Sequence, residues 1–355
     1  MKRSIYIISI GVLISSVVAT ASEEKLASEF RQICAEKAAA ANAADTMTIV
    51  GREGWMFLAN ELRHISVGEF FGEAAMEVSK ATKPDRRDPL PAILDFKAGL
   101  ERVGIELLLV PVPPKAIVYP DMLDGKLQAE ADGQTPRLDL YHQNFYKLLQ
   151  EQGVAVLDLV PAFTAARLDE KGDAYCKQDS HWSGRGCEIT AQQIAERLKG
   201  RPWLEAAQKQ SLVSEVREMK IGGDLWNAAK GTKPPKEKLS LRVVGTKDSG
   251  MLQPVPPDRS SPVILMGDSH TLVFHVGEDM HARGAGLADQ LANEFGFAVD
   301  LIGVRGSGAS PTRITLFRRC KDPNYLKSKK LLIWCLSARE FTEAVTGWRV
   351  LPVVK

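Results

Sequence analysis

Five continuous apolar runs constrain the fold of this chain more than any other feature of its sequence. They lie at 105–112, 154–160, 262–267, 297–304 and 330–337. Runs in which successive residues are apolar, instead of alternate ones, indicate strands that are covered on both faces. Amphipathic helical patterns lie around and between them, at 89–103, 137–152, 184–199 and 284–296. This alternation of strands and helices predicts an α/β fold, a three-layer sandwich with a mostly parallel sheet.

The length and composition are those of one large domain with additions, which we place at 46–345. The chain has 355 residues, of which 45% are hydrophobic and 25% are charged, so it can bury a large core. Residues 46–72, rich in glycine and aromatic side chains, predict short strands and a turn. Residues 201–260, rich in lysine, proline and glycine, predict an exposed, loop-rich insertion. Because 46 basic residues nearly balance 44 acidic ones, the net charge gives no attraction to nucleic acid.

The N-terminal segment 1–21 has the pattern of an export signal. Two basic residues precede an apolar run over 5–18, and Ala19 and Ala21 occupy the small-residue positions of a signal-peptidase site. The run is short and contains serines, which favours cleavage after Ala21 over a permanent membrane anchor. Either outcome predicts a protein that works outside the cytoplasm, which is the periplasm if the source is bacterial.

The tripeptide Asp-Ser-His occurs twice, and each copy carries the three side-chain types of a serine hydrolase triad. Neighbouring side chains diverge, whereas a nucleophile, a base and a carboxylate must meet in a line of hydrogen bonds, so neither copy is a complete site. The second copy follows the apolar run at 262–267, at the carboxyl end of a predicted central strand, where α/β sheets bind ligands. Gly267 permits a sharp turn there, and a following helix would direct its amides towards the serine. Ser269 is therefore the predicted nucleophile, and Asp268 is expected to shape the turn.

The first copy lies in a polar loop that leads into a helix, with Ser183 as the expected N-cap. Asp179 and His181 are two residues apart, so in an extended loop their side chains project to one side and Ser180 to the other. His181 can then act as the base while Asp179 fixes its tautomer. The two copies are thus complementary, because the first supplies acid and base and the second supplies the nucleophile.

These blocks resemble those of a known family. "GDSH" after a strand resembles the serine block of the SGNH hydrolase superfamily, and "QDSHWSGRG" resembles the Asp-x-His-Trp signature of the alginate O-acetyltransferase family, the AlgJ and AlgX type. In that family the Asp-x-His block precedes the serine block, as it does here, which reverses the order of ordinary SGNH esterases. Further similar segments are "GREGWMFL", "PVPPKAIVYP", "VRGSGAS" and "SAREFTE". Together they extend over roughly 50–345.

The resemblance implies an SGNH hydrolase-like fold and an extracytoplasmic O-acetyltransferase acting on an exopolysaccharide such as alginate. It implies Ser269 as the acetyl-accepting nucleophile, His181 as the base and Asp179 as its partner. The backbone amides of Ser269, Gly306 and Gly308 would form the oxyanion hole. A membrane-bound O-acyltransferase is the implied acetyl donor, and no cofactor is expected. Because the chain ends soon after the last predicted strand, we expect no C-terminal carbohydrate module, which makes the AlgJ type the nearer match.

Other polar residues near the predicted site have two interpretations each. Lys115 and Arg305, at predicted strand ends, can contact a uronate or phosphate group of the substrate, or can simply be solvated. Trp182 can stack on a sugar or can pack the loop. His270 and His275 are expected on a helix after the nucleophile, at solvent or at the edge of the cleft.

Cysteines and metal ligands give weaker signals. The five cysteines are an odd number, so at least one is free or paired with another chain. Cys176 and Cys187 bracket the first Asp-Ser-His and predict either a disulfide that fastens the loop or two small buried residues. No Cys-x-x-Cys spacing suggests structural zinc. Asp179, His181, Asp268 and His270 could together bind a metal ion. No further cluster of carboxylates supports such a site, so we expect no metal.

Two rival functions use the same predicted fold. A carbohydrate esterase would use the same triad with water as acceptor, and the residue pattern does not separate it from a transferase, because the acceptor depends on how water is kept from the acyl-enzyme. A polysaccharide-binding protein would keep the fold without using Ser269 chemically. Detection of acetylated sugar, of acetate alone, or of neither product distinguishes the three.

Overall fold

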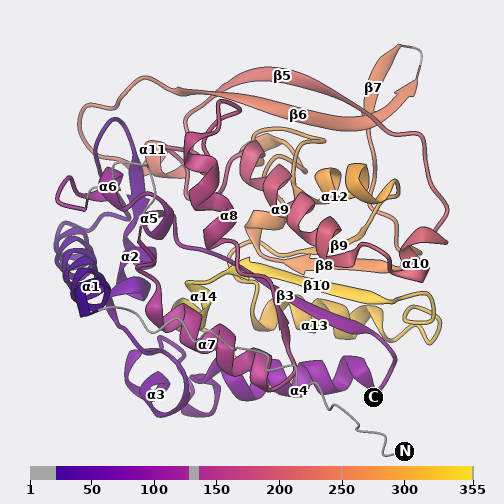
Figure 1. Cartoon of the computed structure of the whole chain (residues 1–355), viewed down its shortest axis with the longest axis horizontal. Helices are drawn as coiled ribbons and strands as arrows, with labels where there is room; N and C mark the ends of the chain where they lie inside the picture. The colour runs from indigo at the N-terminus through magenta and orange to yellow at the C-terminus, as the bar shows by residue number, and fades with distance from the viewer. Residues whose placement is uncertain (1–20, 128–135, 249, 354–355) are drawn as a thin grey trace, which may run out of the picture.

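The central sheet has five parallel strands, as the apolar runs predict. The computed structural model describes residues 21–127, 136–248 and 250–353, so most of the predicted export segment lies outside the described residues. The strands stand in the order β4-β3-β10-β8-β9 (Figure 1), and every neighbouring pair is parallel. Their bounds are β3 Glu106–Val112, β4 Ala155–Val156, β8 Val263–Gly267, β9 Asp300–Gly303 and β10 Leu331–Ser337. The strands β4 and β9 are much shorter than the apolar runs at 154–160 and 297–304 that predict them.

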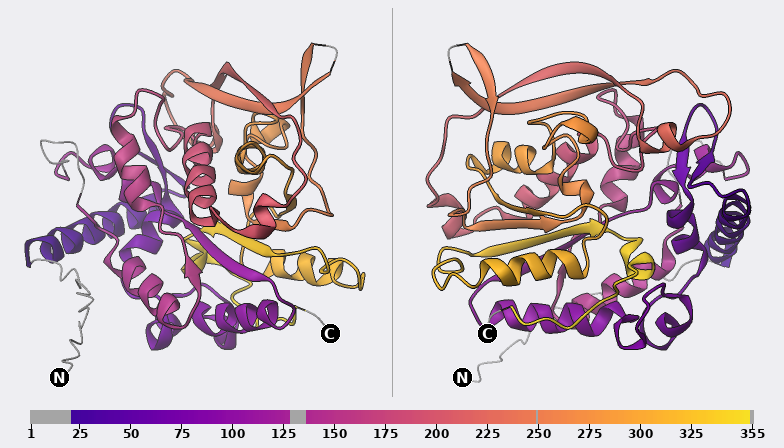
Figure 2. Two further views of the ribbon diagram at one scale, coloured as in Figure 1. Left: turned by 45° about the vertical axis from the view of Figure 1, so that its right-hand side comes forward. Right: turned by 180° about the vertical axis from the view of Figure 1, so that it is seen from behind.

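Helices cover both faces of this sheet, which gives the predicted three-layer sandwich (Figures 1 and 2). Alternate residues of each strand belong to opposite cores: in β10, Ile333 packs in one core and Trp334 in the other. One core is completed by α8 Val160–Ala165, α9 Gly184–Leu198 and α12 Leu287–Phe295. The other is completed by α4 Pro89–Glu101, α7 Leu140–Glu151, α13 Ser310–Arg319 and α14 Glu340–Glu343. The four amphipathic patterns of the sequence therefore form helices, each within a few residues of the predicted bounds.

The insertion at 201–260 is not the loop that its composition suggests, and that prediction is wrong. After the short helix α10, Pro202–Glu205, it forms an antiparallel three-stranded sheet in the order β5-β6-β7. The strands are β5 Val213–Ile221, β6 Glu237–Asp248 and β7 Met251–Pro254, with the helix α11 Asp224–Ala228 between the first two. Figure 1 shows this sheet as an outer layer beyond α9 and α12. Most of β5 is exposed, which explains why no apolar alternation marks it in the sequence.

The N-terminal part packs against one side of the sandwich. The helix α1, Ala21–Ala43, precedes the predicted short strands, which pair as an antiparallel hairpin of β1 Thr48–Val50 with β2 Met56–Leu58. The helix α2, Ala59–Ser66, follows directly. The remaining short helices are η1 Gly72–Ala74, α3 Ala75–Val78, η2 Pro84–Arg86, α5 Lys115–Val118, α6 Pro120–Leu123, η3 Ala166–Leu168, η4 Ser269–Thr271 and η5 Glu278–Met280.

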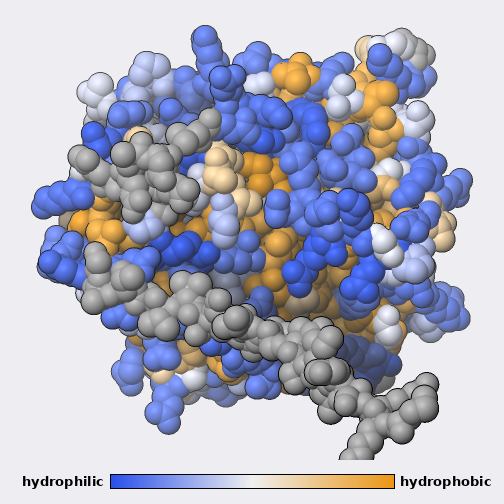
Figure 3. All heavy atoms as spheres, viewed as in Figure 1, coloured by the Kyte–Doolittle hydropathy of each residue, from blue (hydrophilic) through white to orange (hydrophobic). Residues whose placement is uncertain are grey.

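The surface is mixed, with most apolar residues turned inward. Hydrophilic residues dominate the face seen in Figure 3, and apolar ones show between them in patches. Within 21–127, 136–248 and 250–353, no helix has both the length and the hydropathy needed to cross a bilayer.

Candidate active site

Ser269 lies two residues after the end of β8, an interior strand between β10 and β9, and so at the carboxyl end of a strand as predicted. A side chain at Gly267 would put its Cβ 1.8 Å from the carbonyl oxygen of Cys335 on the neighbouring strand, so close strand packing requires this glycine. Asp268 shapes the turn as expected, because its carboxylate accepts hydrogen bonds from the amides of His270 (2.9 Å) and Ser337 (2.7 Å). The segment that follows is a single 3₁₀ turn, η4, and not the longer helix that we predicted.

The first Asp-Ser-His is brought to this serine by a loop closed between Tyr175 and Trp182, which form an antiparallel bridge. His181 Nδ1 lies 2.6 Å from Asp179 Oδ1, and His181 Nε2 lies 2.7 Å from Ser269 Oγ. With the Nδ1 proton donated to the carboxylate, Nε2 is left to accept the proton of the serine hydroxyl. Side chains that are 88 residues apart in sequence thus form one line of hydrogen bonds.

Burial and charge act in opposite directions on this pair. Burial alone would lower the pKa of His181, but the adjacent charge and hydrogen bond of Asp179 raise it above its ordinary value. Burial alone would raise the pKa of Asp179, but the charge and hydrogen bond of His181, with a hydrogen bond from His281, hold it well below its ordinary value. The carboxylate therefore stays ionised and stabilises the imidazolium that would form when His181 takes a proton.

Ser180 points away from this line, as the spacing predicts, and binds a partner that the local sequence does not predict. Its hydroxyl and its amide donate to the two carboxylate oxygens of Asp224, at 2.5 and 2.7 Å. The amide of Asp224 in turn donates to Asp179 Oδ2 at 3.0 Å. The preceding Gly223 packs so closely that a Cβ there would lie 2.4 Å from Asp179 Cβ. The insertion thus holds the Asp179 loop, and nothing in its local sequence signals this long-range contact.

Lys115 does not face a substrate, so that interpretation is wrong. It lies in α5, is 1% exposed, and donates from Nζ to the carbonyl oxygens of Asp179 (2.6 Å) and Met56 (2.9 Å). Its amide donates to Glu61 Oε2 at 2.9 Å. Burial lowers the pKa of Lys115 and raises that of Glu61. Lys115 is therefore a buried anchor for the backbone of the first copy.

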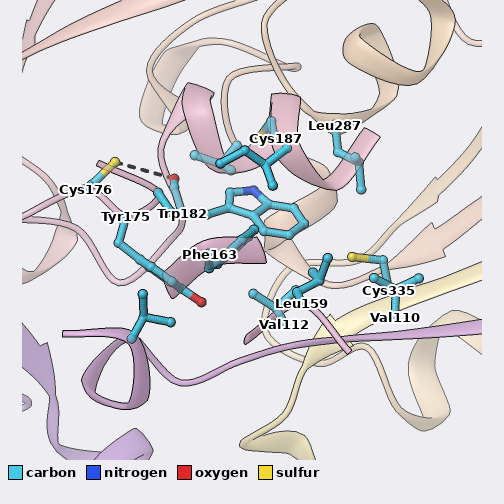
Figure 4. Packing of buried hydrophobic residues seen from close by; sticks show 14 of the residues in the cluster. Val110, Val112, Leu159, Phe163, Tyr175, Cys176, Trp182, Cys187, Leu287 and Cys335 are labelled. Atoms are coloured by element: carbon cyan, nitrogen blue, oxygen red, sulfur yellow. Dashed lines mark hydrogen bonds between the residues drawn. The ribbon is translucent and has the colours of Figure 1, made fainter. Parts of the chain in front are cut away.

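Trp182 packs the loop and does not stack on a sugar. Its side chain is fully buried, and Figure 4 shows the indole among apolar residues that include Phe163, Leu159 and Leu287. Its Nε1 donates to the carbonyl oxygen of His270 at 3.1 Å. The indole thus ties the first Asp-Ser-His to the second.

Cys176 and Cys187 are both free and buried, so the structure has the second of the two predicted arrangements and no disulfide between them. The Cys176 thiol is directed to the carbonyl oxygen of Trp182, 3.4 Å away (Figure 4). Burial raises the pKa of both thiols well above the ordinary value.

His270 does not lie at solvent, which corrects the prediction. It is buried beside His181, with ring centroids 4.8 Å apart, and its Nδ1 pairs with Asp268 Oδ1 at 3.0 Å. His275 lies at the edge of the interior and pairs with Asp289 Oδ2 at 2.9 Å. Neither histidine belongs to a helix of more than one turn.

The residues whose metal-binding atoms converge differ from the set of Asp179, His181, Asp268 and His270 considered from the sequence. In the part of the chain that the structure describes, one group of Asp179, His181 and Asp224 brings its atoms within 4.8 Å of one another. These atoms already take part in the hydrogen bonds described above. Asp268 and His270 pair with each other instead.

The glycine-rich turn after β9 lies beside the serine turn. A Cβ on Gly308 would be 3.1 Å from the amide nitrogen of Asp268 and 2.7 Å from Leu336 Cβ. Gly306 has φ of +90°, which favours glycine. Ser307 between them donates to the carboxylate of the buried Glu340, whose pKa burial raises to about 7. The structure thus brings Gly308 against the second Asp-Ser-His, while Gly306 supplies the bend.

Arg305, at the start of this turn, is half exposed. Its side chain is 53% accessible and pairs through both terminal nitrogens with Asp279, one contact being 2.7 Å. It is the one predicted substrate-binding side chain of the three that reaches solvent.

Comparisons with known proteins match this chain in both sequence and fold. The family model described as the SGNH hydrolase-like domain of the acetyltransferase AlgX matches residues 48–338. The probable alginate O-acetylase AlgJ of Pseudomonas syringae pv. tomato is 25% identical over 238 residues, which are 66% of this chain and 54% of that protein. The AlgJ of Pseudomonas putida is 24% identical over 240 residues, 64% of this chain and 55% of that protein. The chain thus matches about half the length of these curated relatives.

Two solved structures share the fold. The O-acetyltransferase domain of Pseudomonas putida AlgJ superposes with a TM-score of 0.60 at 21% identity, covering 83% of this chain and 92% of that one. AlgX of Pseudomonas aeruginosa superposes with a TM-score of 0.56 at 19% identity, covering 82% and 62%. The predicted α/β sandwich and the family resemblance are therefore confirmed.

Proposed function

Because the chain belongs to the family of SGNH hydrolase-like domains of the acetyltransferase AlgX type, we propose that it transfers acetyl groups to hydroxyls of an exopolysaccharide through an acetyl-serine intermediate. The observation that carries the proposal is the hydrogen-bonded line from Asp179 through His181 to Ser269, with contacts of 2.6 and 2.7 Å. A nucleophile, a base and an orienting carboxylate in this order are the parts that acyl transfer needs.

In the first step the Ser269 oxygen attacks the carbonyl carbon of the acetyl donor. His181 Nε2 accepts the hydroxyl proton as the new carbon–oxygen bond forms, and Asp179 stabilises the resulting imidazolium. The imidazolium then gives this proton to the leaving group as its bond to the acetyl carbon breaks. The products are acetyl-Ser269 and the protonated leaving group, with His181 again neutral.

In the second step a hydroxyl of the polymer replaces the donor. It gives its proton to His181 and attacks the acetyl-serine carbonyl, and the proton passes to Ser269 Oγ when the ester bond to the serine breaks. Both tetrahedral intermediates carry an oxyanion that needs hydrogen-bond donors. The amides of Ser269 and Gly308 are the candidates for this role, with Gly306 holding the bend, since Gly308 packs against the serine turn.

The family and the surface near the site support one choice of acceptor and one of donor. Arg305, at the start of the glycine-rich turn, is exposed and paired with Asp279, and a planar guanidinium suits the carboxylate of a uronate polymer such as alginate. Acetyl-CoA is not available outside the cytoplasm, so the donor is an acyl group passed across the membrane by a membrane-bound O-acyltransferase. The expected location is the periplasm, after export by the segment 1–21.

The test combines the purified protein with p-nitrophenyl acetate as donor and uronate oligosaccharides as acceptors. Mass spectrometry of the sugars and of the protein measures acetylated oligosaccharide and acetyl-Ser269. Acetylated sugar that depends on Ser269 supports transfer. Acetate without acetylated sugar would instead assign an esterase, and no acetyl-serine with any donor would overturn the proposal.

A further inference from the structure

Asp179 is held by a second histidine that the sequence pattern does not predict. Its Oδ1 accepts from the amide (3.0 Å) and from Nδ1 (2.6 Å) of His181, and its Oδ2 accepts from His281 Nε2 (2.9 Å) and from the amide of Asp224 (3.0 Å). Each oxygen of the carboxylate therefore faces two donors. His281 comes from the chain segment between η4 and α12, 102 residues away in sequence.

The backbone at His281 is in a conformation that a histidine rarely adopts. Its φ is +72° and its ψ is −74°, and the amide of Ala282 donates to the carbonyl oxygen of Met280 at 3.0 Å. These values describe the strained form of the γ-turn. Strain of this kind persists where the surroundings impose it, and it gathers at functional sites.

The segment around His281 is fastened on several sides. The amide of Phe274 donates to the carbonyl oxygen of Met280 at 2.8 Å, and the Phe274 ring lies 5.6 Å from that of His281. Val276 and Arg283 form an antiparallel bridge. Asp279, two residues before His281, pairs with Arg305 at the glycine-rich turn. The loop at 274–283 thus presents one strained histidine to the carboxylate that orients the base.

We infer that His281 is a positioning residue for the acyl-transfer reaction: by donating to Asp179 Oδ2, it fixes the plane of the carboxylate so that Oδ1 faces His181 Nδ1. This inference rests on the proposed function. A carboxylate bound only through Oδ1 can rotate about its Cβ–Cγ bond, and each rotation weakens the hydrogen bond that selects the His181 tautomer. Two donors on Oδ2 oppose that rotation, and His281 is the one supplied by a side chain.

The experiment compares three variants of the full chain, His281→Ala, His281→Gln and Arg283→Ala. Glutamine retains an N–H donor at the end of its side chain, and Arg283 is an exposed residue of the same loop that serves as the control. Turnover of p-nitrophenyl acetate gives kcat and KM. Proton NMR at low temperature monitors the downfield Nδ1–H resonance of His181, which reports the bond to Asp179 without any turnover.

We expect His281→Ala to lower kcat about 10- to 100-fold with little change in KM, the loss expected for one hydrogen bond to a charged group. The His181 resonance should move upfield, and His281→Gln should recover most of both losses. Wild-type kcat and an unchanged resonance in His281→Ala would overturn the inference. Equal losses in the alanine and glutamine variants, with an equal drop in melting temperature, would show a purely structural role. If the resonance responds as expected but acetyl-serine never forms, the proposed function fails and the positioning of Asp179 stands.

Discussion

The two Asp-Ser-His segments share one local hydrogen-bond pattern and have different surroundings. In each, the aspartate accepts a hydrogen bond from the amide of the histidine two residues later, at 3.0 Å in the first copy and 2.9 Å in the second. In each, the same aspartate oxygen also pairs with histidine Nδ1, at 2.6 and 3.0 Å. The tripeptide thus folds locally into one motif, an aspartate-histidine pair closed by a backbone hydrogen bond.

The two copies differ in the partner of the serine hydroxyl and in the partner of the histidine Nε2. In the first copy His181 Nε2 meets Ser269, and Ser180 is bound by Asp224. In the second copy Ser269 is hydrogen-bonded to the histidine of the first copy. His270 is buried, with its ring against those of His181 and Trp182. Tertiary contacts, and not the tripeptide, therefore assign the base to one copy and the nucleophile to the other.

Replacing the serine of each copy by alanine, one at a time, gives the largest expected difference in activity between the copies. We expect Ser269→Ala to lower acetyl transfer by at least about 10³-fold, because no other group can form the acetyl ester. Ser180→Ala should keep most of the activity and lose about 1.5 to 3 kcal/mol of stability, since one hydrogen bond to the Asp224 carboxylate is lost. Transfer assays and melting curves of both variants measure this. Near-normal acetylation by Ser269→Ala would remove the distinction between the copies.

The two aspartates should separate activity from stability. Asp179→Asn should lower activity about 10²- to 10⁴-fold, less than His181→Ala, because the ring remains while its tautomer is no longer fixed. Asp268→Asn should cost about 2 kcal/mol or more of stability, because the buried carboxylate accepts from His270 Nδ1 and two amides. Denaturant unfolding and kinetics on the same preparations test the pair. A fully active, destabilised Asp179→Asn would reverse the assignment.

Local sequence predicts the parts of each copy, but not what holds them. The apolar runs place Ser269 at the end of a central strand, and the spacing of two places Asp179 and His181 together. Asp224 and His281 reach Asp179 from 45 and 102 residues away, and no local periodicity reports such contacts.

The errors have a common physical origin. Lysine and tryptophan in loops are usually solvated or available to ligands, whereas Lys115 and Trp182 satisfy their polar atoms on backbone carbonyl oxygens inside the protein. The strand β5 has few buried residues, so it lacks the alternation that identifies a half-buried strand. Lys115 and Trp182 are placed by distant carbonyl oxygens, and β5 is placed by its pairing with β6. In each case a contact distant in sequence decides the structure.

Each copy is also packed by one glycine, which offers a smaller test. Gly223→Ala would place a Cβ 2.4 Å from Asp179 Cβ and 2.5 Å from the carbonyl oxygen of Gln178. Because backbone must move to relieve this, we expect roughly a tenfold loss of activity from misplacement of Asp179. At Gly308 the nearest atoms are 2.7 and 3.1 Å away, so Gly308→Ala should disturb the site less. Kinetics of the two variants measure the two losses of activity, and circular dichroism confirms folding. A greater loss in Gly308→Ala than in Gly223→Ala would contradict the prediction.

The smallest effect concerns the pH dependence of stability, where the two histidines should have opposite signs. Asp179 raises the pKa of His181 above 6.5 in the folded state, so protonation of His181 stabilises the fold. That contribution is full below pH 6.5 and is lost as the pH rises through the folded pKa. Burial lowers the pKa of His270 below 6.5, so His270 resists protonation in the folded state. Its penalty is absent at high pH and grows as the pH falls through 6.5.

Replacing each histidine by alanine should therefore change stability in opposite ways with pH. His181→Ala removes a contribution that is present in acid, so its loss of unfolding free energy should be greater at about pH 5.5 than at about pH 8. His270→Ala removes a penalty that is present in acid, so its loss should be smaller at about pH 5.5 than at about pH 8. Urea unfolding of both variants beside the wild type, at each pH, measures the two differences. Equal pH dependence in the two variants would mean that the copies share one electrostatic environment, and that only the position of Ser269 distinguishes them.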